Sequence, residues 1–287
     1  MVQWYYLVLI SSLLMGTATI LEKNTLKHDH ATVYSATFSL VILVISLVFL
    51  PFANFHVTLF DIVAVYLLSL VSTVTYLLTA KVFRHGSITV ASPIFSSIPA
   101  IFVVLLALPL LHEQLFLTQY VGIGIMIICT YLLLFKTSAG DKAFDSNKYI
   151  WIILLDSLLT AFGTILMKYL FTLGINIFTY FILVEAFIAL NLSIFMVLKF
   201  GGFGEMVKNL SQYRFSIPVI ALLTIGYRIT YYMAVSSAFV SLISPVRNSI
   251  YILVTIFVGG TIFNEKHLYK KIAITLILLA AMYYLVI

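Results

Sequence analysis

Apolar residues fill most of this chain in long runs, which short polar segments interrupt. Ten of the runs are about 20 residues long, the length that a helix needs to cross the hydrocarbon core of a bilayer. They predict ten membrane-spanning helices, with boundaries near residues 3–22, 31–52, 58–80, 87–111, 116–135, 149–171, 175–198, 215–236, 239–263 and 269–287. Helices are expected because lipid cannot pair with exposed backbone polar groups, and a helix satisfies these groups within itself.

One pattern occurs twice along the chain. The dipeptide Ser92-Pro93 recurs as Ser244-Pro245, and Glu113 recurs as Glu265, both about 152 residues further on. Each copy is an apolar helix with a proline near its start and a glutamate at its end, followed by a second apolar helix. Since internal repeats indicate the architecture of a chain, two related halves are expected.

The polar segment around residues 137–148 is the clear linker between the halves. It divides five predicted spans, in residues 1–136, from five others, in residues 149–287. A further pair of matching segments supports this division, because Thr19–Lys23 (TILEK) resembles Thr164–Lys168 (TILMK).

Composition and charge agree with a membrane protein. The 287 residues are 63% hydrophobic and only 9% charged, whereas soluble domains carry about 25% charged residues. The net charge of +6 would suggest nucleic acid in a soluble protein, but 13 of the 16 basic residues lie in loops after odd-numbered spans. By the positive-inside rule these loops face the cytoplasm, and both termini face outward. The expected partner is therefore the lipid bilayer rather than nucleic acid, and the expected location is the plasma membrane of a prokaryote.

Corresponding loops of the two halves differ in charge. The loop that carries Glu113 (LHEQL) contains no lysine or arginine, whereas its copy with Glu265 (NEKHLYKK) is basic. The two copies therefore face opposite sides of the membrane, as an odd number of spans per repeat requires. The expected fold is an all-α integral membrane protein, with ten transmembrane helices arranged as two inverted five-helix repeats around a central cavity. Inverted repeats are typical of secondary transporters, whose substrate site lies near the bilayer midplane.

The repeated motif also carries a family resemblance. Residues 88–93 (ITVASP) with Glu113 and Gly122, and residues 240–245 (VSLISP) with Glu265, resemble the drug/metabolite transporter superfamily in its EamA-type, ten-helix branch. The resemblance implies transport of small metabolites by alternating access, without ATP. Because members carry amino acids, nucleotide sugars, sugar phosphates or drugs, the resemblance leaves the substrate open.

Charged residues inside predicted spans are costly and therefore functional candidates. Arg247 lies about eight residues into its span, roughly 12 Å deep, and Arg228 lies near the middle of the preceding span. Their planar guanidinium groups suit a carboxylate or a phosphate. Glu185 could bind an ammonium group, carry a proton or pair with Arg228. The alternative is that each arginine pairs with Glu185 or Asp156 and holds helices together.

Aromatic and amide side chains surround these arginines in the sequence. Tyr227 and Tyr231 share a helix face, Tyr76 occupies the position that corresponds to Arg228 in the first half, and Asn248 follows Arg247. They are candidates for hydrogen bonds to substrate. Since aromatics make up 15% of the chain, packing in interfacial belts is the competing interpretation.

The repeated prolines and glutamates have structural interpretations. Pro93 and Pro245 each remove a backbone donor and are predicted to act as kinks or hinges. Glu113 and Glu265 are predicted to stabilise the turns after their own spans, because a carboxylate is favourable near a helix start.

The remaining charged groups in spans are expected to be structural. Glu22 and Lys23 lie near a predicted span end and are expected to extend to the membrane interface. Asp156 and Lys168 are expected to make helix-end or inter-helix contacts.

These features predict a secondary active transporter of a small polar metabolite, with an amino acid or related carboxylate as the first expectation. Exchange of an organophosphate or nucleotide sugar is the main alternative, and transport of an organic cation is a further one. A proton or a counter-transported solute would be the coupling partner. An intramembrane enzyme is the least favoured interpretation, because no HExxH or GxSxG motif occurs, and no cofactor or metal is expected.

Overall fold

A computed structural model describes residues 3–26, 30–85, 88–135, 147–200, 202–263, 269–270, 272–274, 276–277 and 280–281. All regular elements in this part of the chain are helical. In chain order they are α1 (Trp4–Leu26), α2 (Ala31–Ser46), η1 (Leu47–Phe52), α3 (Leu59–His85), α4 (Ile88–Leu110), α5 (Leu117–Phe135), α6 (Asn147–Thr172), α7 (Ile177–Phe200), α8 (Gly204–Gln212), α9 (Ser216–Ser237), α10 (Val240–Val254), η2 (Thr255–Gly259) and α11 (Gly260–Ile262).

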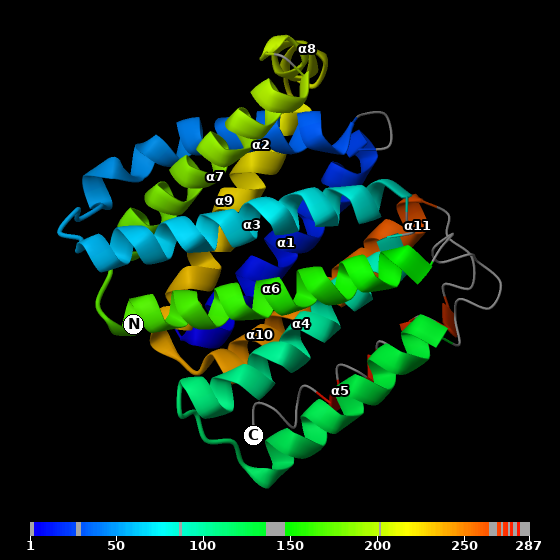
Figure 1. Cartoon of the computed structure of the whole chain (residues 1–287). Helices are drawn as coiled ribbons and strands as arrows, with labels where there is room; N and C mark the ends of the chain where they lie inside the picture. Colours follow the sequence, from blue (N-terminus) through cyan, green and yellow to red (C-terminus); the bar gives the residue numbers. More distant parts are fainter. Residues whose placement is uncertain are drawn as a thin grey trace.

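Seven helical segments of the described chain are long and apolar enough to cross a membrane. They are Trp4–Leu26, Ala31–Phe52, Leu59–Phe83, Trp151–Thr172, Ile177–Phe200, Ser216–Ser237 and Val240–Ile262. The protein is therefore an integral, multi-pass membrane protein. Most of the predicted span at 269–287 lies outside the described residues. The short helix α8, which Figure 1 shows at the edge of the bundle, occupies what the sequence predicted as a loop.

The first helix runs through the middle of the bundle (Figure 1). It packs against α9 and α10, while α6 packs against α3 and α4. In the same way α2 packs against α9, and α7 packs against α3. Each of these contacts therefore has a counterpart when α1 is exchanged with α6, α2 with α7, α3 with α9, and α4 with α10.

A glycine is required where α1 passes close to the end of α10. A Cβ atom built on Gly16 would lie 2.6 Å from Cγ1 of Val254, which is too close without a shift of one helix. Directly after Val254 the chain adopts the wider π-helical turn η2. Small residues are the usual means by which membrane helices approach closely.

Both predicted kink residues lie within helices. Pro245 is inside α10, and Pro93 falls within the bounds of α4. Neither helix is interrupted at its proline, so a hinge role stays a prediction.

Two charged side chains hold the connection between α9 and α10, one from the loop between α4 and α5 and one from α6. Glu113 accepts hydrogen bonds from the backbone N–H groups of Val240 (2.9 Å) and Ser241 (3.0 Å), at the start of α10. Lys168 donates from α6 to the carbonyl oxygens of Val235 (2.7 Å) and Ala238 (2.9 Å), at the end of α9.

Glu113 therefore stabilises a helix start, as expected, but the helix is α10 and not the one that follows its own turn. Its carboxylate meets the positive end of a helix dipole, yet this helix belongs to the other half of the chain instead of following its own turn. The preceding residue, His112, has a φ of 53°, in the left-handed region that few non-glycine residues adopt. The structural role predicted for Glu265 lies outside the described residues.

Candidate functional site

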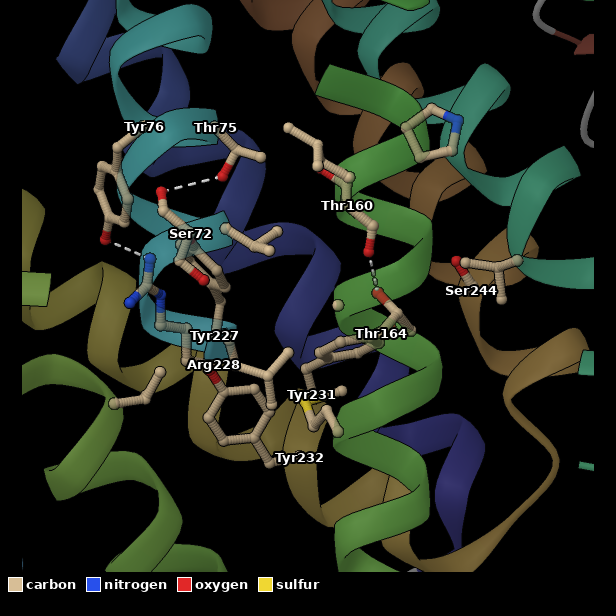
Figure 2. A pocket seen from close by; sticks show the side chains of 18 of the residues that line it. Ser72, Thr75, Tyr76, Thr160, Thr164, Tyr227, Arg228, Tyr231, Tyr232 and Ser244 are labelled. Atoms are coloured by element: carbon tan, nitrogen blue, oxygen red, sulfur yellow. Dashed lines mark hydrogen bonds between the residues drawn. The ribbon is translucent and has the colours of Figure 1, made fainter. Parts of the chain in front are cut away.

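A cavity of about 260 Å³ lies in the middle of the bundle, among α1, α3, α4, α6, α7, α9 and α10. All seven residues that the sequence predicts as substrate ligands line it: Tyr76, Glu185, Tyr227, Arg228, Tyr231, Arg247 and Asn248. Figure 2 shows its wall of tyrosines beside the hydroxyl groups of Thr160 and Thr164 on α6. Helices from both halves of the chain thus meet around one polar space.

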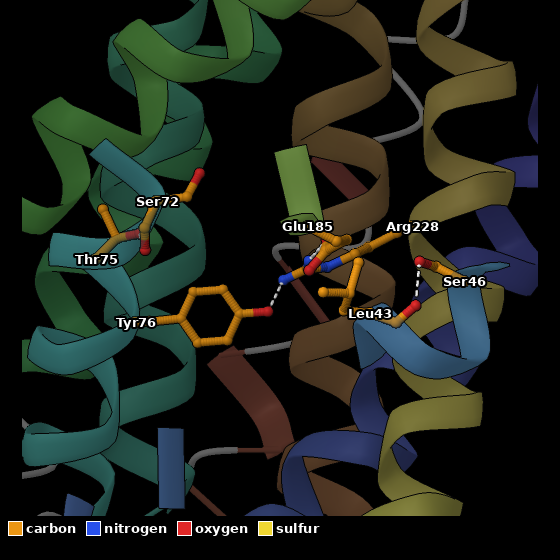
Figure 3. Close-up of polar contacts among 7 residues, drawn as sticks. All are labelled: Leu43, Ser46, Ser72, Thr75, Tyr76, Glu185 and Arg228. Atoms are coloured by element: carbon orange, nitrogen blue, oxygen red, sulfur yellow. Dashed lines mark hydrogen bonds and ion pairs between the residues drawn. The ribbon is translucent and has the colours of Figure 1, made fainter. Parts of the chain in front are cut away.

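Arg228 is held at the centre of a polar cluster. Its guanidinium forms an ion pair and a hydrogen bond with Glu185 of α7, and it donates a second hydrogen bond to the hydroxyl oxygen of Tyr76 on α3 (Figure 3). The Glu185 side chain is completely buried, and that of Arg228 is 15% exposed. The pairing that the sequence left as an alternative is therefore present for Arg228.

Arg247 has different surroundings. Its Nε donates to Oγ of Ser11 at 3.1 Å, and this hydroxyl donates to the carbonyl oxygen of Tyr227 at 2.8 Å. The guanidinium carbon lies 4.1 Å from the ring centroid of Tyr231, a cation–π distance. Between described residues the one ion pair within 4 Å joins Arg228 to Glu185, so no described carboxylate neutralises Arg247.

Two contacts in the cavity wall join corresponding positions of the two halves. Arg228 contacts Tyr76, and the amide of Asn248 donates to the carbonyl oxygen of Ser96 at 2.8 Å. Both pairs are 152 residues apart, the offset that separates the repeated Ser-Pro dipeptides.

A second chamber of about 200 Å³ adjoins the first. The two share the seven lining residues Met15, Thr75, Tyr76, Phe95, Thr160, Tyr227 and Arg228. Two carboxylates line the second chamber, Glu22 from α1 and Asp156 from α6. Asp156 is 3% exposed and accepts a hydrogen bond from Oγ1 of Thr79 at 3.4 Å.

The sequence missed this acidic chamber. Glu22 was expected to extend to the membrane interface, whereas the structure places it in the lining of this chamber, four residues before the end of α1. The available signal was the cost of a charge inside a span, which makes any such group a functional candidate. Among the described residues no group of three or more histidine, cysteine, aspartate or glutamate side chains could hold a metal ion.

The long apolar helices define an integral membrane protein, and a polar cavity near the middle of such a bundle is typical of transporters. Residues 2–135 match the model of the EamA-like transporter family, in agreement with the drug/metabolite transporter superfamily. This match confirms the resemblance seen in the repeated motif. The match covers slightly less than half of the 287 residues, so it shows that the first half of the chain is similar to a family of membrane transporters.

Similarity to solved structures supports the fold. One crystal structure, whose title names no function, is similar with a TM-score of 0.66 over 97% of this chain and 94% of the other, at 10% sequence identity. At this identity the similarity shows the fold alone. No curated protein matches the chain in sequence.

Proposed function

We propose that this protein is a secondary active transporter that carries a small carboxylate-bearing metabolite, with α-amino acids as the first candidates. The observation that carries the proposal is the guanidinium of Arg247, which lines the cavity without a described carboxylate partner. An unneutralised cation in the membrane interior is costly, and a bound anion would relieve that cost. A guanidinium also matches a carboxylate in geometry.

The number of charges favours a monoanion. Since Glu185 neutralises Arg228, the first chamber offers one net positive charge, on Arg247. A phosphate of charge near −2 would need Arg228 to leave Glu185, so the organophosphate alternative is less favoured. A free organic cation would meet the repulsion of Arg247 in this chamber.

Alternating access is the proposed mechanism, by movement of two inverted five-helix repeats about the central cavity. Helix contacts of the first half recur between the corresponding helices of the second half, and this supports the layout. The two contacts between positions 152 residues apart support it as well. The bond from Arg228 to Tyr76 and the bond from Arg247 to Ser11 both cross between the halves. These are the bonds that a rocking movement would break and remake.

For the coupling partner of transport and for the orientation in the membrane, we propose what the sequence predicts. A proton carried by Glu185 is one proposed coupling partner, and a counter-transported solute is the other. If Glu185 carries the proton, Glu185→Gln removes the pH dependence of transport, whereas an unchanged pH profile rejects this role. We also propose that both termini face outward, and a C-terminal tag that proves accessible only from the cytoplasm would contradict this orientation.

The central experiment is uptake of radiolabelled amino acids and organic acids into proteoliposomes. Arg247→Ala is expected to abolish uptake, and Arg247→Lys to restore part of it, since lysine keeps the charge but lacks the planar fork. Arg214→Ala is the matched control, because Arg214 lies outside the cavity, between α8 and α9. Undiminished uptake of every anionic or zwitterionic solute by Arg247→Ala would overturn the proposal.

A further inference from the structure

We propose that a groove between α2 and α8 binds an acyl chain of an anionic phospholipid, whose headgroup is held by Lys199 and Lys208. This lipid site is separate from the central cavity. The inference goes beyond the proposed function, because it depends neither on the substrate nor on the transport mechanism.

The groove has a volume of about 450 Å³, which makes it larger than the central cavity. The described residues that line it come from α2, from α8 with the residue before it, and from the first turn of α9: Thr37, Leu40, Val41, Val44, Ile45, Phe203, Met206, Val207, Leu210 and Pro218. The one polar side chain in this set is that of Thr37, whose hydroxyl already donates to the carbonyl oxygen of Val33 at 2.9 Å. Such a lining suits a hydrocarbon chain.

The wall that α2 contributes is a continuous apolar strip. Its five lining residues recur at i, i+3, i+4, i+7 and i+8 from Thr37 to Ile45, the spacing of a single helix face. Eight residues of helix make this wall about 12 Å long. Val44 on it is 66% exposed, within a segment long and apolar enough to cross the membrane. An acyl chain along this wall therefore runs into the bilayer in the same way as the surrounding lipid chains.

The opposite wall is the apolar face of α8, which packs against α2 (Figure 1). Met206 on this face is buried, whereas Val207 is 67% exposed, so protein covers the face only in part. Because α8 connects α7 to α9, and both of these helices can span the membrane, α8 lies at a membrane surface. A short amphipathic helix at this depth buries its apolar face among acyl chains. The uncovered part of α8 and the strip of α2 thus enclose a place for one such chain.

Basic residues flank the groove. Lys199 lies in the last turn of α7, four residues before Phe203. Lys208 follows Val207 in α8, and both lysines are exposed. From Lys199 to the start of α9 the chain has three basic residues and one acidic residue, Glu205. Between described residues neither lysine has a carboxylate within 4 Å, and a lipid phosphate would supply the missing counter-charge, since basic residues at a membrane surface attract anionic lipids.

The test is a titration of the purified full-length protein in detergent with two lipids that have the same acyl chains. Phosphatidylglycerol is anionic, and phosphatidylcholine has no net charge. Native mass spectrometry resolves the lipid-bound forms and gives an affinity for each lipid. Thermal unfolding of every variant checks that it is folded.

Two pairs of variants separate the groove from the charges. Val44→Trp fills the groove, and Val48→Trp is its matched control, because Val48 is 70% exposed but does not line the groove. The double variant Lys199→Ala/Lys208→Ala removes the two charges. Its control is Lys81→Ala/Lys270→Ala, which removes two exposed lysines outside the groove.

We expect the wild type to bind phosphatidylglycerol at least about fivefold more tightly than phosphatidylcholine. In Lys199→Ala/Lys208→Ala this preference disappears, while the affinity for phosphatidylcholine stays within about twofold, because the acyl-chain groove is intact. Val44→Trp weakens the binding of both lipids at least about fivefold. Both control variants bind the two lipids as the wild type does.

Three outcomes overturn the assignment. Equal affinity of the wild type for both lipids rejects the headgroup site at the two lysines. Equal effects of Val44→Trp and Val48→Trp show that the lipid is not bound in the groove. A concentration-dependent dimer that Val44→Trp abolishes and Val48→Trp retains assigns the groove to a second copy of the chain.

Discussion

The ion pair between Arg228 and Glu185 yields a quantitative prediction about stability. Arg228→Met removes the cation and leaves a completely buried carboxylate, whereas Glu185→Gln leaves a guanidinium that is 15% exposed and still bonded to Tyr76. Breaking a buried pair by removing one partner costs about 3–5 kcal/mol. We expect Arg228→Met to be near the upper value and Glu185→Gln near the lower one, because the carboxylate is the more deeply buried charge.

The wild type, the two single variants and the double variant Arg228→Met/Glu185→Gln form a double-mutant cycle, in which the double variant is the most informative. It leaves no unpaired charge, and exchange of a buried pair for neutral groups of similar volume is often close to neutral. Its loss of stability should therefore be smaller than that of either single variant, that is, below about 3 kcal/mol. The two single losses, about 5 and about 3 kcal/mol, would then together exceed the double loss by about 5 kcal/mol or more. We also expect the double variant to keep its uptake of organic acids into proteoliposomes, because Arg247 is proposed to hold the carboxylate.

Thermal unfolding in a fixed detergent measures this cycle, with all four proteins compared under the same conditions. At about 2–4 °C per kcal/mol, the single variants should unfold about 6–20 °C below the wild type, in the order given. Additive losses in the double variant would refute the reasoning, since they would mean that Glu185 does not neutralise Arg228. Loss of organic-acid uptake in a stable double variant would instead assign Arg228 to substrate contact.

Three further predictions concern the helix contacts around the cavity, each measured by thermal unfolding. Glu113→Gln should lower stability by about 1.5–3 kcal/mol, because an amide cannot accept both N–H bonds at the start of α10; an effect no larger than that of the exposed Glu205→Gln would contradict this. Lys168→Met should lower stability by a similar amount, because the carbonyl oxygens of Val235 and Ala238 lose their hydrogen bonds to the lysine. Wild-type stability of this variant would show that these two bonds do not hold the end of α9. Gly16→Ala should cost about 1–3 kcal/mol by forcing α1 away from α10. Gly124→Ala should be tolerated, because no atom of the described residues lies within 4 Å of its added Cβ, and equal effects of the two substitutions would refute the close approach.

Much of the candidate site could be predicted because charges are rare in this chain. Arg228 and Arg247 stand out in apolar runs, since a charge inside a membrane needs a partner or a polar cavity. Tyr76 could be assigned from the repeat offset, which places it at the position corresponding to Arg228. The cavity lining includes all of these residues.

Other features could not be read from local patterns. Glu22 was assigned to the interface, because the polar residues after it look like a loop, whereas α1 continues to Leu26. The short helix α8 was missed because its apolar residues are too few to resemble a span. Helix ends depend on capping and tertiary contacts, which a hydropathy pattern does not contain.

The sequence alone determines that this chain is a helical membrane protein with an internal repeat, because the lengths of its apolar runs match a bilayer and its motifs recur at one offset. Only the tertiary structure decides which charged groups meet. Glu185 pairs with Arg228 from 43 residues away, and Glu113 caps a helix more than 120 residues further on. Such pairings depend on how packed helices are rotated and placed against one another, and this geometry leaves Arg247 in the cavity wall without a described carboxylate partner.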